Sequence, residues 1–289
     1  MRSSNPILSR RGFSRIDARG AEAARPRSVG LSAGAQWPGD HPGSPYAGFD
    51  DPGPAEDVSA GSTPMTLDDV VVRTAASLGT VALAAVLSWT LLPVDETGVA
   101  RSYAIAVGCA LVAFVLSLVQ TSRRSPSPAL ILGYAAFEGV FVGVLSEVTS
   151  TYIAPGVVVQ AVLGTLTVFA GVLIAYRMRW IRVTARFSGF VLAAATGFVL
   201  LTVADLLFSA FGGGNGLGFD SGGLGIAFGV VGIVLGACFL ALDFRQVEDA
   251  VADGAPREEA WLAAFGLTLT LVWIYLEVLR VLTLLRGDD

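Results

Sequence analysis

The chain has 289 residues, of which 53% are hydrophobic and only 15% are charged. Soluble domains carry roughly 25% charged residues, so this composition excludes an ordinary soluble protein and favours a membrane protein. The net charge of −5 is spread along the chain, which predicts no nucleic-acid partner.

Residues 1–66 are rich in Pro, Gly and Ser and show no periodic apolar pattern. Such a segment buries too little apolar surface to offset its ordering entropy, so we expect a disordered tail. Its first half is basic and its second half acidic. The basic half is suited to lie on anionic lipid headgroups; the alternative is a solvated tail that only helps to fix the topology.

The chain becomes apolar after Thr66, which we expect to cap the first helix, with Asp68 and Asp69 in its first turn. Seven apolar stretches follow, at about 74–93, 103–120, 129–152, 157–176, 188–211, 223–244 and 261–285. Each is roughly 18–25 residues long, which is enough to cross a bilayer as a helix. Lipid offers backbone groups no other hydrogen-bond partners. We therefore predict an all-α membrane protein with seven transmembrane helices.

The arginines predict the orientation of these spans. Seven of them lie in the tail before the first span, Arg123 and Arg124 follow the second, and four more lie between residues 177 and 186, after the fourth. The loops on the other side hold only Arg101. By the positive-inside rule, the N-terminus is expected in the cytoplasm and the C-terminus outside, in a cell membrane.

Several acidic residues lie within the spans. Glu138 falls near the middle of the third span, where a charge costs about 2.5–3.5 kcal/mol on insertion scales, so it should face the bundle interior or be protonated. Glu147 and Asp205 lie nearer the outer ends and are expected to reach water. Asp243 and Glu277 flank the polar bend 245–260 between the last two spans.

Two partners are open to Glu277. Arg280 lies three residues further along the same helix and can face it. Alternatively, Glu277 faces Asp243; two adjacent carboxylates cannot both ionise cheaply, so the pair would share a proton and, when deprotonated, bind a cation such as Ca²⁺.

The length of the bend argues against that second arrangement. Asp243 lies about 12 residues before a bend centred at 254–256, and Glu277 about 22 after it, a mismatch of roughly 15 Å along the helices. A contact therefore requires a bend nearer residue 260, or a separate surface helix at 256–263.

Four motifs resemble those of the Bax inhibitor family. FEGVFVGVLS at 137–146 is similar to its third-span signature, and AVLGTLTVF at 161–169 to its fourth-span pattern. LDFRQ at 242–246 and LVWIYLEVLRVLTLLR at 271–286 are similar to its sixth- and seventh-span motifs. Together they cover about 67–286 and leave out the tail. The resemblance implies a seven-helix bundle with a central last helix and, in bacterial members, a pH-sensitive Ca²⁺ leak.

In such members an acid pair on the last two helices gates the pore. Asp243 matches the first acid and Glu277 the second, which is commonly Asp, whereas Arg280 stands where Asn is common. The second span also lacks the acid that bacterial channel members place there. Arg123 or Arg124 would have to replace the arginine that latches the closed pair.

We therefore expect a pH-sensitive Ca²⁺ leak gated by Asp243 and Glu277, with protons, Ca²⁺ and the lipid bilayer as partners. The alternative is a non-conducting regulator that binds a membrane protease or a stress-response protein. We expect no enzyme and no cofactor, because the only histidine, His41, lies in the tail and leaves none for a Ser–His or zinc site in the membrane. Cys109 and Cys238 lie apart in apolar stretches and are expected to be structural thiols.

Overall fold

The computed structural model describes residues 63–92, 94–95, 98–123, 125–153, 155–211, 216–219 and 221–287. The predictions for residues 1–62, including the disorder of the tail and the place of His41, lie outside these residues, and so does Arg124. Residues 63–66, which the composition assigned to the tail, do have a defined structure: residues 63–65 pair with the bend between the last two helices, and Thr66 caps the first helix.

The predicted all-α fold with seven spans is confirmed. The helices are α1 (Leu67–Leu91), α2 (Val99–Ser122), α3 (Pro128–Tyr152), α4 (Val157–Arg177), α5 (Ala185–Phe211), α6 (Gly222–Ala252) and α7 (Ala260–Gly287). All seven are long and apolar enough to cross a membrane. A single 3-10 turn, η1 (Arg257–Glu259), precedes α7, and the only β pairing in the described residues is the isolated bridge between Pro64 and Pro256.

All seven helices are longer than the apolar stretches that predicted them, and the largest extensions are at the start of α1 and at the end of α6. α1 begins at Leu67, where Thr66 acts as the expected N-cap: its hydroxyl accepts the Asp69 N–H at 3.2 Å, and the Asp69 carboxylate accepts the Thr66 N–H at 3.3 Å. This reciprocal capping box satisfies two backbone donors that the first turn leaves free. α6 continues to Ala252, because the polar sequence after Asp243 contains no helix breaker before Gly254.

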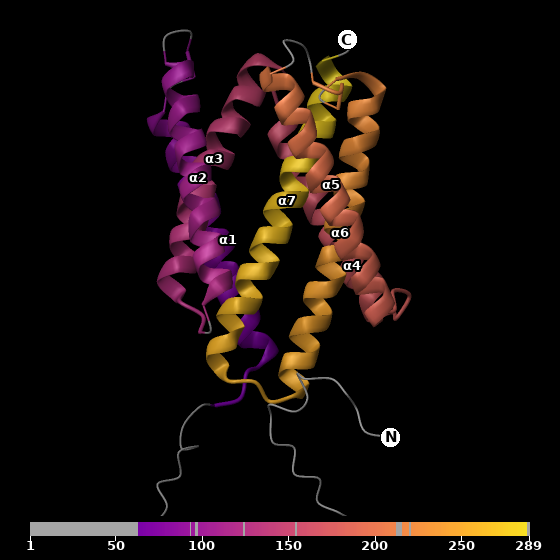
Figure 1. Cartoon of the computed structure of the whole chain (residues 1–289). Coiled ribbons are helices and arrows are strands. Elements are labelled where there is room, and N and C mark those ends of the chain that lie inside the picture. Colours follow the sequence, from indigo (N-terminus) through magenta and orange to yellow (C-terminus); the bar gives the residue numbers. More distant parts are fainter. Residues whose placement is uncertain are drawn as a thin grey trace, which may run out of the picture. The chain divides into compact units, whose positions relative to one another are not determined.

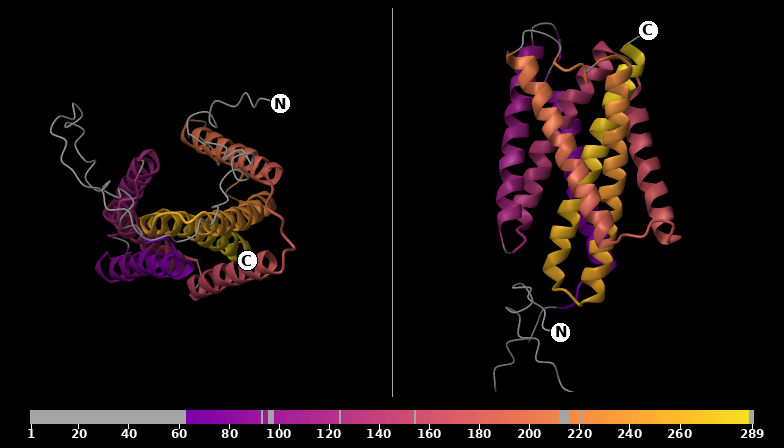
Figure 2. Two further views of the ribbon diagram at one scale, coloured as in Figure 1. Left: turned by 90° about the horizontal axis from the view of Figure 1, so that it is seen from below. Right: turned by 45° about the vertical axis from the view of Figure 1, so that its right-hand side comes forward.

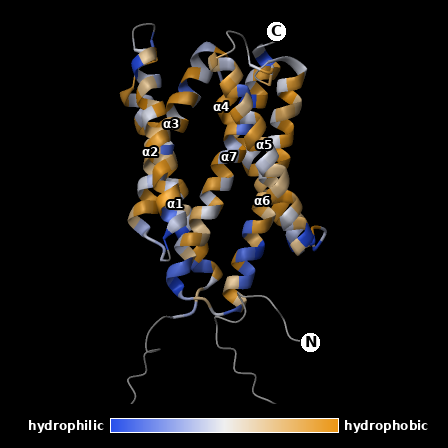
Figure 3. Cartoon of the chain, in the orientation of Figure 1, coloured by the Kyte–Doolittle hydropathy of each residue, from blue (hydrophilic) through white to orange (hydrophobic). Residues whose placement is uncertain are grey.

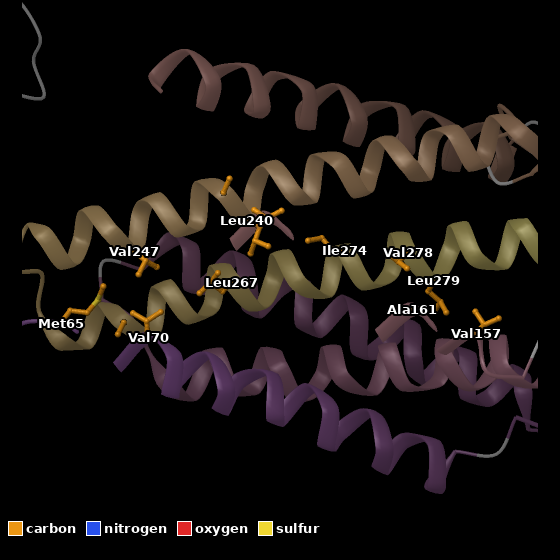
Figure 4. Packing of buried hydrophobic residues seen from close by; sticks show 13 residues of the cluster. Met65, Val70, Val157, Ala161, Leu240, Val247, Leu267, Ile274, Val278 and Leu279 are labelled. Atoms are coloured by element: carbon orange, nitrogen blue, oxygen red, sulfur yellow. The ribbon is translucent and has the colours of Figure 1, made fainter. Parts of the chain in front are cut away.

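The last helix is central, as the resemblance implied. α7 packs against α1, α3, α4 and α6, and Figures 1 and 2 show it crossing the middle of the bundle. Its largest buried cluster joins Leu267, Ile274 and Val278 of α7 to Leu240 of α6 and Ala161 of α4 (Figure 4). α2 packs on α3, and α5 packs on α6.

The faces of the helices that are turned away from this core are apolar rather than polar. Large side chains such as Leu83, Leu111 and Phe190 are more than half exposed. Figure 3 shows hydrophobic residues along the whole length of the bundle, with hydrophilic residues gathered at the helix ends. This distribution is expected of helices surrounded by lipid, because apolar side chains meet no water there.

Candidate functional site

The interface between α6 and α7 contains the two acids of interest, and we call it the seam. Four glycines of α6 recur at spacings of four, three and four residues on the face that meets α7: Gly225, Gly229, Gly232 and Gly236. Cβ atoms built at these positions would meet the α7 side chains of Leu284, Val281, Glu277 and Ile274, respectively. The missing side chains thus let the two helices approach closely, as small residues do between membrane helices.

Asp243 lies on this same face of α6, three turns beyond Gly232. Its side chain is half-buried, and its Oδ2 accepts a hydrogen bond of 2.6 Å from the Thr270 hydroxyl of α7. Its Oδ1 lies next to Gly266, one turn earlier on α7. Asp243 is therefore held by α7, but by a hydroxyl group and not by a second carboxylate.

Glu277 lies at a different level of the seam. Its carboxyl group packs against Gly232, where an added Cβ would lie 2.7 Å from the Glu277 Cδ. Its Oε2 is 3.8 Å from a guanidinium nitrogen of Arg280, and the side chain is only 14% exposed. Glu277 thus occupies a notch made by a glycine, with a positive charge one turn away on its own helix.

Arg280 connects this acid to the loop between α5 and α6. One of its nitrogens donates a hydrogen bond of 2.6 Å to the Phe219 carbonyl oxygen. Its guanidinium carbon lies 5.4 Å from the ring centre of Phe228, which stacks on both Phe219 and Phe198. The guanidinium group is therefore fixed by a carbonyl, an aromatic face and a carboxylate together.

The structure does not bring Asp243 and Glu277 into contact. Glu277 packs against Gly232 of α6, and Asp243 lies eleven residues further along that helix, or about 16 Å along its axis. The bend lies at Asp253–Pro256, and η1 leads straight into α7, so neither a displaced bend nor a separate surface helix closes the gap. Of the two arrangements left open by the sequence, the structure contains the pairing of Glu277 with Arg280 and not the contact of Glu277 with Asp243.

The other candidate residues do not reach the seam. Glu138 shares the buried face of α3 with Tyr134, Ala135 and Val142, which pack toward Phe265 and Val272 of α7. Those two residues lie on the opposite side of α7 from the seam-facing Thr270 and Glu277. Among the described residues, Arg123 is exposed after α2 and forms no ion pair with either acid.

The expectation that Glu147 and Asp205 reach water is wrong for Asp205. Asp205 is only 6% exposed, and its Oδ1 accepts the Leu217 N–H at 2.6 Å beside Gly216, which adopts a positive φ of 65°. It therefore fastens the loop before α6. Glu147 is half-buried, with its Oε2 enclosed and without a hydrogen-bond partner.

Sequence reasoning missed two hydroxyl bridges that attach α7 to the opposite side of the bundle. The Ser77 and Thr268 hydroxyls are 2.6 Å apart, and so are those of Ser146 and Tyr275. The spacing of these four common residues gives no signal before the helices are packed. α7 is consequently bonded through polar groups to α1 and α3 on one side and to α6 on the other.

No three His, Cys, Asp or Glu residues cluster as a metal site within the described part of the chain. Cys109 and Cys238 are free thiols on α2 and α6. Asp243 and Glu277 do not converge on one ion, because a Ca²⁺ ion binds oxygens at about 2.3–2.6 Å and these acids are much further apart.

Seven apolar helices, of which the last is central, with ionisable groups on an internal seam, define a multi-pass membrane protein. A family model described as "Bax inhibitor 1 like" matches residues 5–287, and the chain belongs to this family. The match extends into the tail, which the four motifs did not cover. A comparison of the sequence with curated proteins found no match.

Proposed function

We propose that this protein is a cation leak of the cell membrane, with Ca²⁺ as a transported ion and a path that follows the seam between α6 and α7. The observation that carries the proposal is the placement of Asp243 and Glu277 on one helix–helix interface, at two depths. Intramembrane carboxylates are costly, and they commonly mark ion pathways. The arginine distribution favours a cytoplasmic N-terminus and an external C-terminus.

The separation of the two acids changes how such a leak would work. A shared proton requires carboxylates in contact, so Asp243 and Glu277 act as successive stations rather than as one gating pair. Within the described part of the chain, Asp243 accepts a hydrogen bond from a hydroxyl and has no ion-pair partner, so it is the group that offers charge to a cation. Glu277 is partly neutralised by Arg280. An ion moving along the seam therefore meets an available carboxylate first on the side of the bend.

The sign of the pH dependence follows from this assignment. Deprotonated Asp243 attracts a cation and protonated Asp243 does not, so Ca²⁺ flux should rise with pH and fall on acidification. The experiment is Ca²⁺ entry into liposomes that contain the full chain, measured across a pH series. We expect Asp243→Asn to lower the flux and to flatten its pH dependence.

Asp249→Asn is the matched control, because Asp249 lies on α6 outside the seam, in an exposed ion pair with Arg245. It should leave the flux and its pH profile unchanged. Absence of flux at every pH, or equal flux from the wild type and Asp243→Asn, would refute the leak.

A second function, that of a non-conducting regulator with a membrane-protein partner, is favoured by the family match within the tail and by the pairing of residues 63–65 with the α6–α7 bend. Neither function requires a catalytic group or a cofactor. Deleting residues 1–60 separates the two functions. A regulator would lose its cellular effect while any Ca²⁺ flux stayed intact, whereas a leak whose effect depends on conduction would keep both.

A further inference from the structure

The segment that enters α1 is attached to the bend between α6 and α7. The Met65 N–H donates to the Ala255 carbonyl oxygen at 2.8 Å, and the Arg257 N–H donates to the Thr63 carbonyl oxygen at 3.1 Å. These two bonds enclose Pro64 and Pro256, which face each other as an antiparallel pair that is not hydrogen-bonded. Proline has no N–H to donate, so both prolines occupy positions where none is needed.

Side chains reinforce this short pairing. Met65 is only 2% exposed and packs in one cluster with Val70 of α1 and Val247 of α6 (Figure 4). Ala260 of α7 belongs to the same cluster. Because Met65 belongs to a buried apolar cluster that includes residues of all three helices, the segment that precedes α1 packs as part of the bundle core.

Charged groups bind the same bend from α1. The Arg257 Nε is 2.7 Å from the Asp69 carboxylate, and Arg73 donates to the Arg257 carbonyl oxygen. The Arg73 guanidinium also lies 5.5 Å from the ring centre of Trp261, in the first turn of α7. We call residues 63–73 together with 255–257 the clasp.

The clasp lies where it can control the seam. The bend joins the two helices that form the seam, and the Asp243–Thr270 contact lies only about three turns from it on either helix. Helices α6 and α7 cannot separate near Asp243 unless the bend moves, and the clasp fixes the bend to α1.

We propose that the clasp holds the cytoplasmic half of the seam closed and that the seam opens when the clasp is released. The effect on ion flux rests on the proposed leak. The control of the separation of α6 from α7 does not depend on the proposed leak.

The test locks the clasp with a disulfide. Opposed residues of such an antiparallel pair have Cβ atoms about 4.5–5.5 Å apart and Cα atoms close enough for a disulfide. Pro64→Cys and Pro256→Cys are combined in full-length protein whose Cys109 and Cys238 have been replaced by Ser. Pro64→Cys alone, in the same background, is the control for the substitution itself.

Two measurements are made on the oxidised and reduced forms: Ca²⁺ flux in liposomes, and backbone hydrogen exchange at residues 240–244 and 266–270. We expect oxidation to lower the flux several-fold and to slow the exchange, with both restored by a reducing agent. Asp69→Asn combined with Arg257→Gln should do the reverse, raising the flux and speeding the exchange. Arg245→Gln, which breaks an exposed ion pair outside the clasp, should change neither.

The outcomes separate the two proposals. Failure of the disulfide to form under oxidation overturns the clasp, whatever the flux. A disulfide that forms but leaves exchange at 240–244 and 266–270 unchanged overturns the control of the seam. Slowed exchange in a protein that conducts at no pH supports the clasp and removes only the leak.

Discussion

Gly232→Ala tests whether the carboxyl group of Glu277 occupies the glycine notch in the seam. The added Cβ would lie 2.7 Å from the Glu277 Cδ and 2.8 Å from its Oε2. Ordinary carbon contacts are about 3.5–4.0 Å, so the carboxyl group must move by about 1 Å. Arg280 holds that group from one side, and α6 blocks the other.

The expected change in the free energy of unfolding is the difference between a cost of overpacking and a gain in helix propensity. Overpacking of this kind costs about 1–3 kcal/mol, whereas alanine is favoured over glycine within a helix by about 1 kcal/mol. The single variant should therefore lose about 0–2 kcal/mol of stability. In a Glu277→Ala background the clash is absent, and the same substitution should stabilise the protein by up to about 1 kcal/mol.

The reversal of sign makes this prediction specific. The four proteins of the double-mutant cycle are unfolded in mixed micelles by a titration with denaturing detergent. Trp273 serves as the fluorescent probe, because its Nε1 donates to the Gly232 carbonyl oxygen at 3.2 Å. Gly197→Ala on α5, where an added Cβ meets nothing within 4 Å, is the matched control and should be neutral or stabilising.

An effect of Gly232→Ala that is the same in both backgrounds would refute the notch, because independent sites add. A stabilising effect in the wild-type background would do so as well. In either case Glu277 would have to lie elsewhere, and the assignment of Arg280 as its partner would lose its support.

Two further predictions concern arginines in contrasting environments. Arg280→Gln leaves Glu277 without its positive partner and frees the Phe219 carbonyl, so it should destabilise the protein by about 3–5 kcal/mol in the same unfolding assay. Adding Glu277→Gln should recover much of that loss, and a double variant no more stable than the single one would contradict the pairing. Arg179 lies two residues after the end of α4 and has a left-handed φ of 58°, which costs a non-glycine residue about 1–2 kcal/mol. Arg179→Gly should therefore raise stability by about 1 kcal/mol, whereas Arg182→Gly, at a residue without a positive φ, should not; equal effects would refute the backbone argument.

The bend between α6 and α7 shows how far sequence reasoning about the site extended. The residue count alone exposed a mismatch of roughly 15 Å between Asp243 and Glu277, and the structure contains that mismatch. The count could not say which partners the two acids would take instead. Arg280 was foreseeable, because three residues on a helix place two side chains on one face. Thr270 was not, because its approach to Asp243 depends on how α7 slides along α6.

The glycines of α6 carried a signal that the sequence reading left unused. Their spacing of four, three and four residues marks one face of the helix, and Asp243 falls on that face. That pattern identifies the side of α6 on which α7 packs. It does not identify the α7 residue that enters each notch, so the place of Glu277 at Gly232 still required the packed structure.

The sequence by itself determined the seven spans and the first helix cap, and its four motifs pointed to the family. Spans follow from local composition, because a helix satisfies its backbone hydrogen bonds within its own segment and needs only an apolar length of chain. Contacts between spans were decided by the tertiary structure alone. The burial of Asp205, the hydroxyl bridges to α7 and the clasp at Pro64 and Pro256 join residues distant in sequence. Their register depends on which side chains interlock once the helices have met.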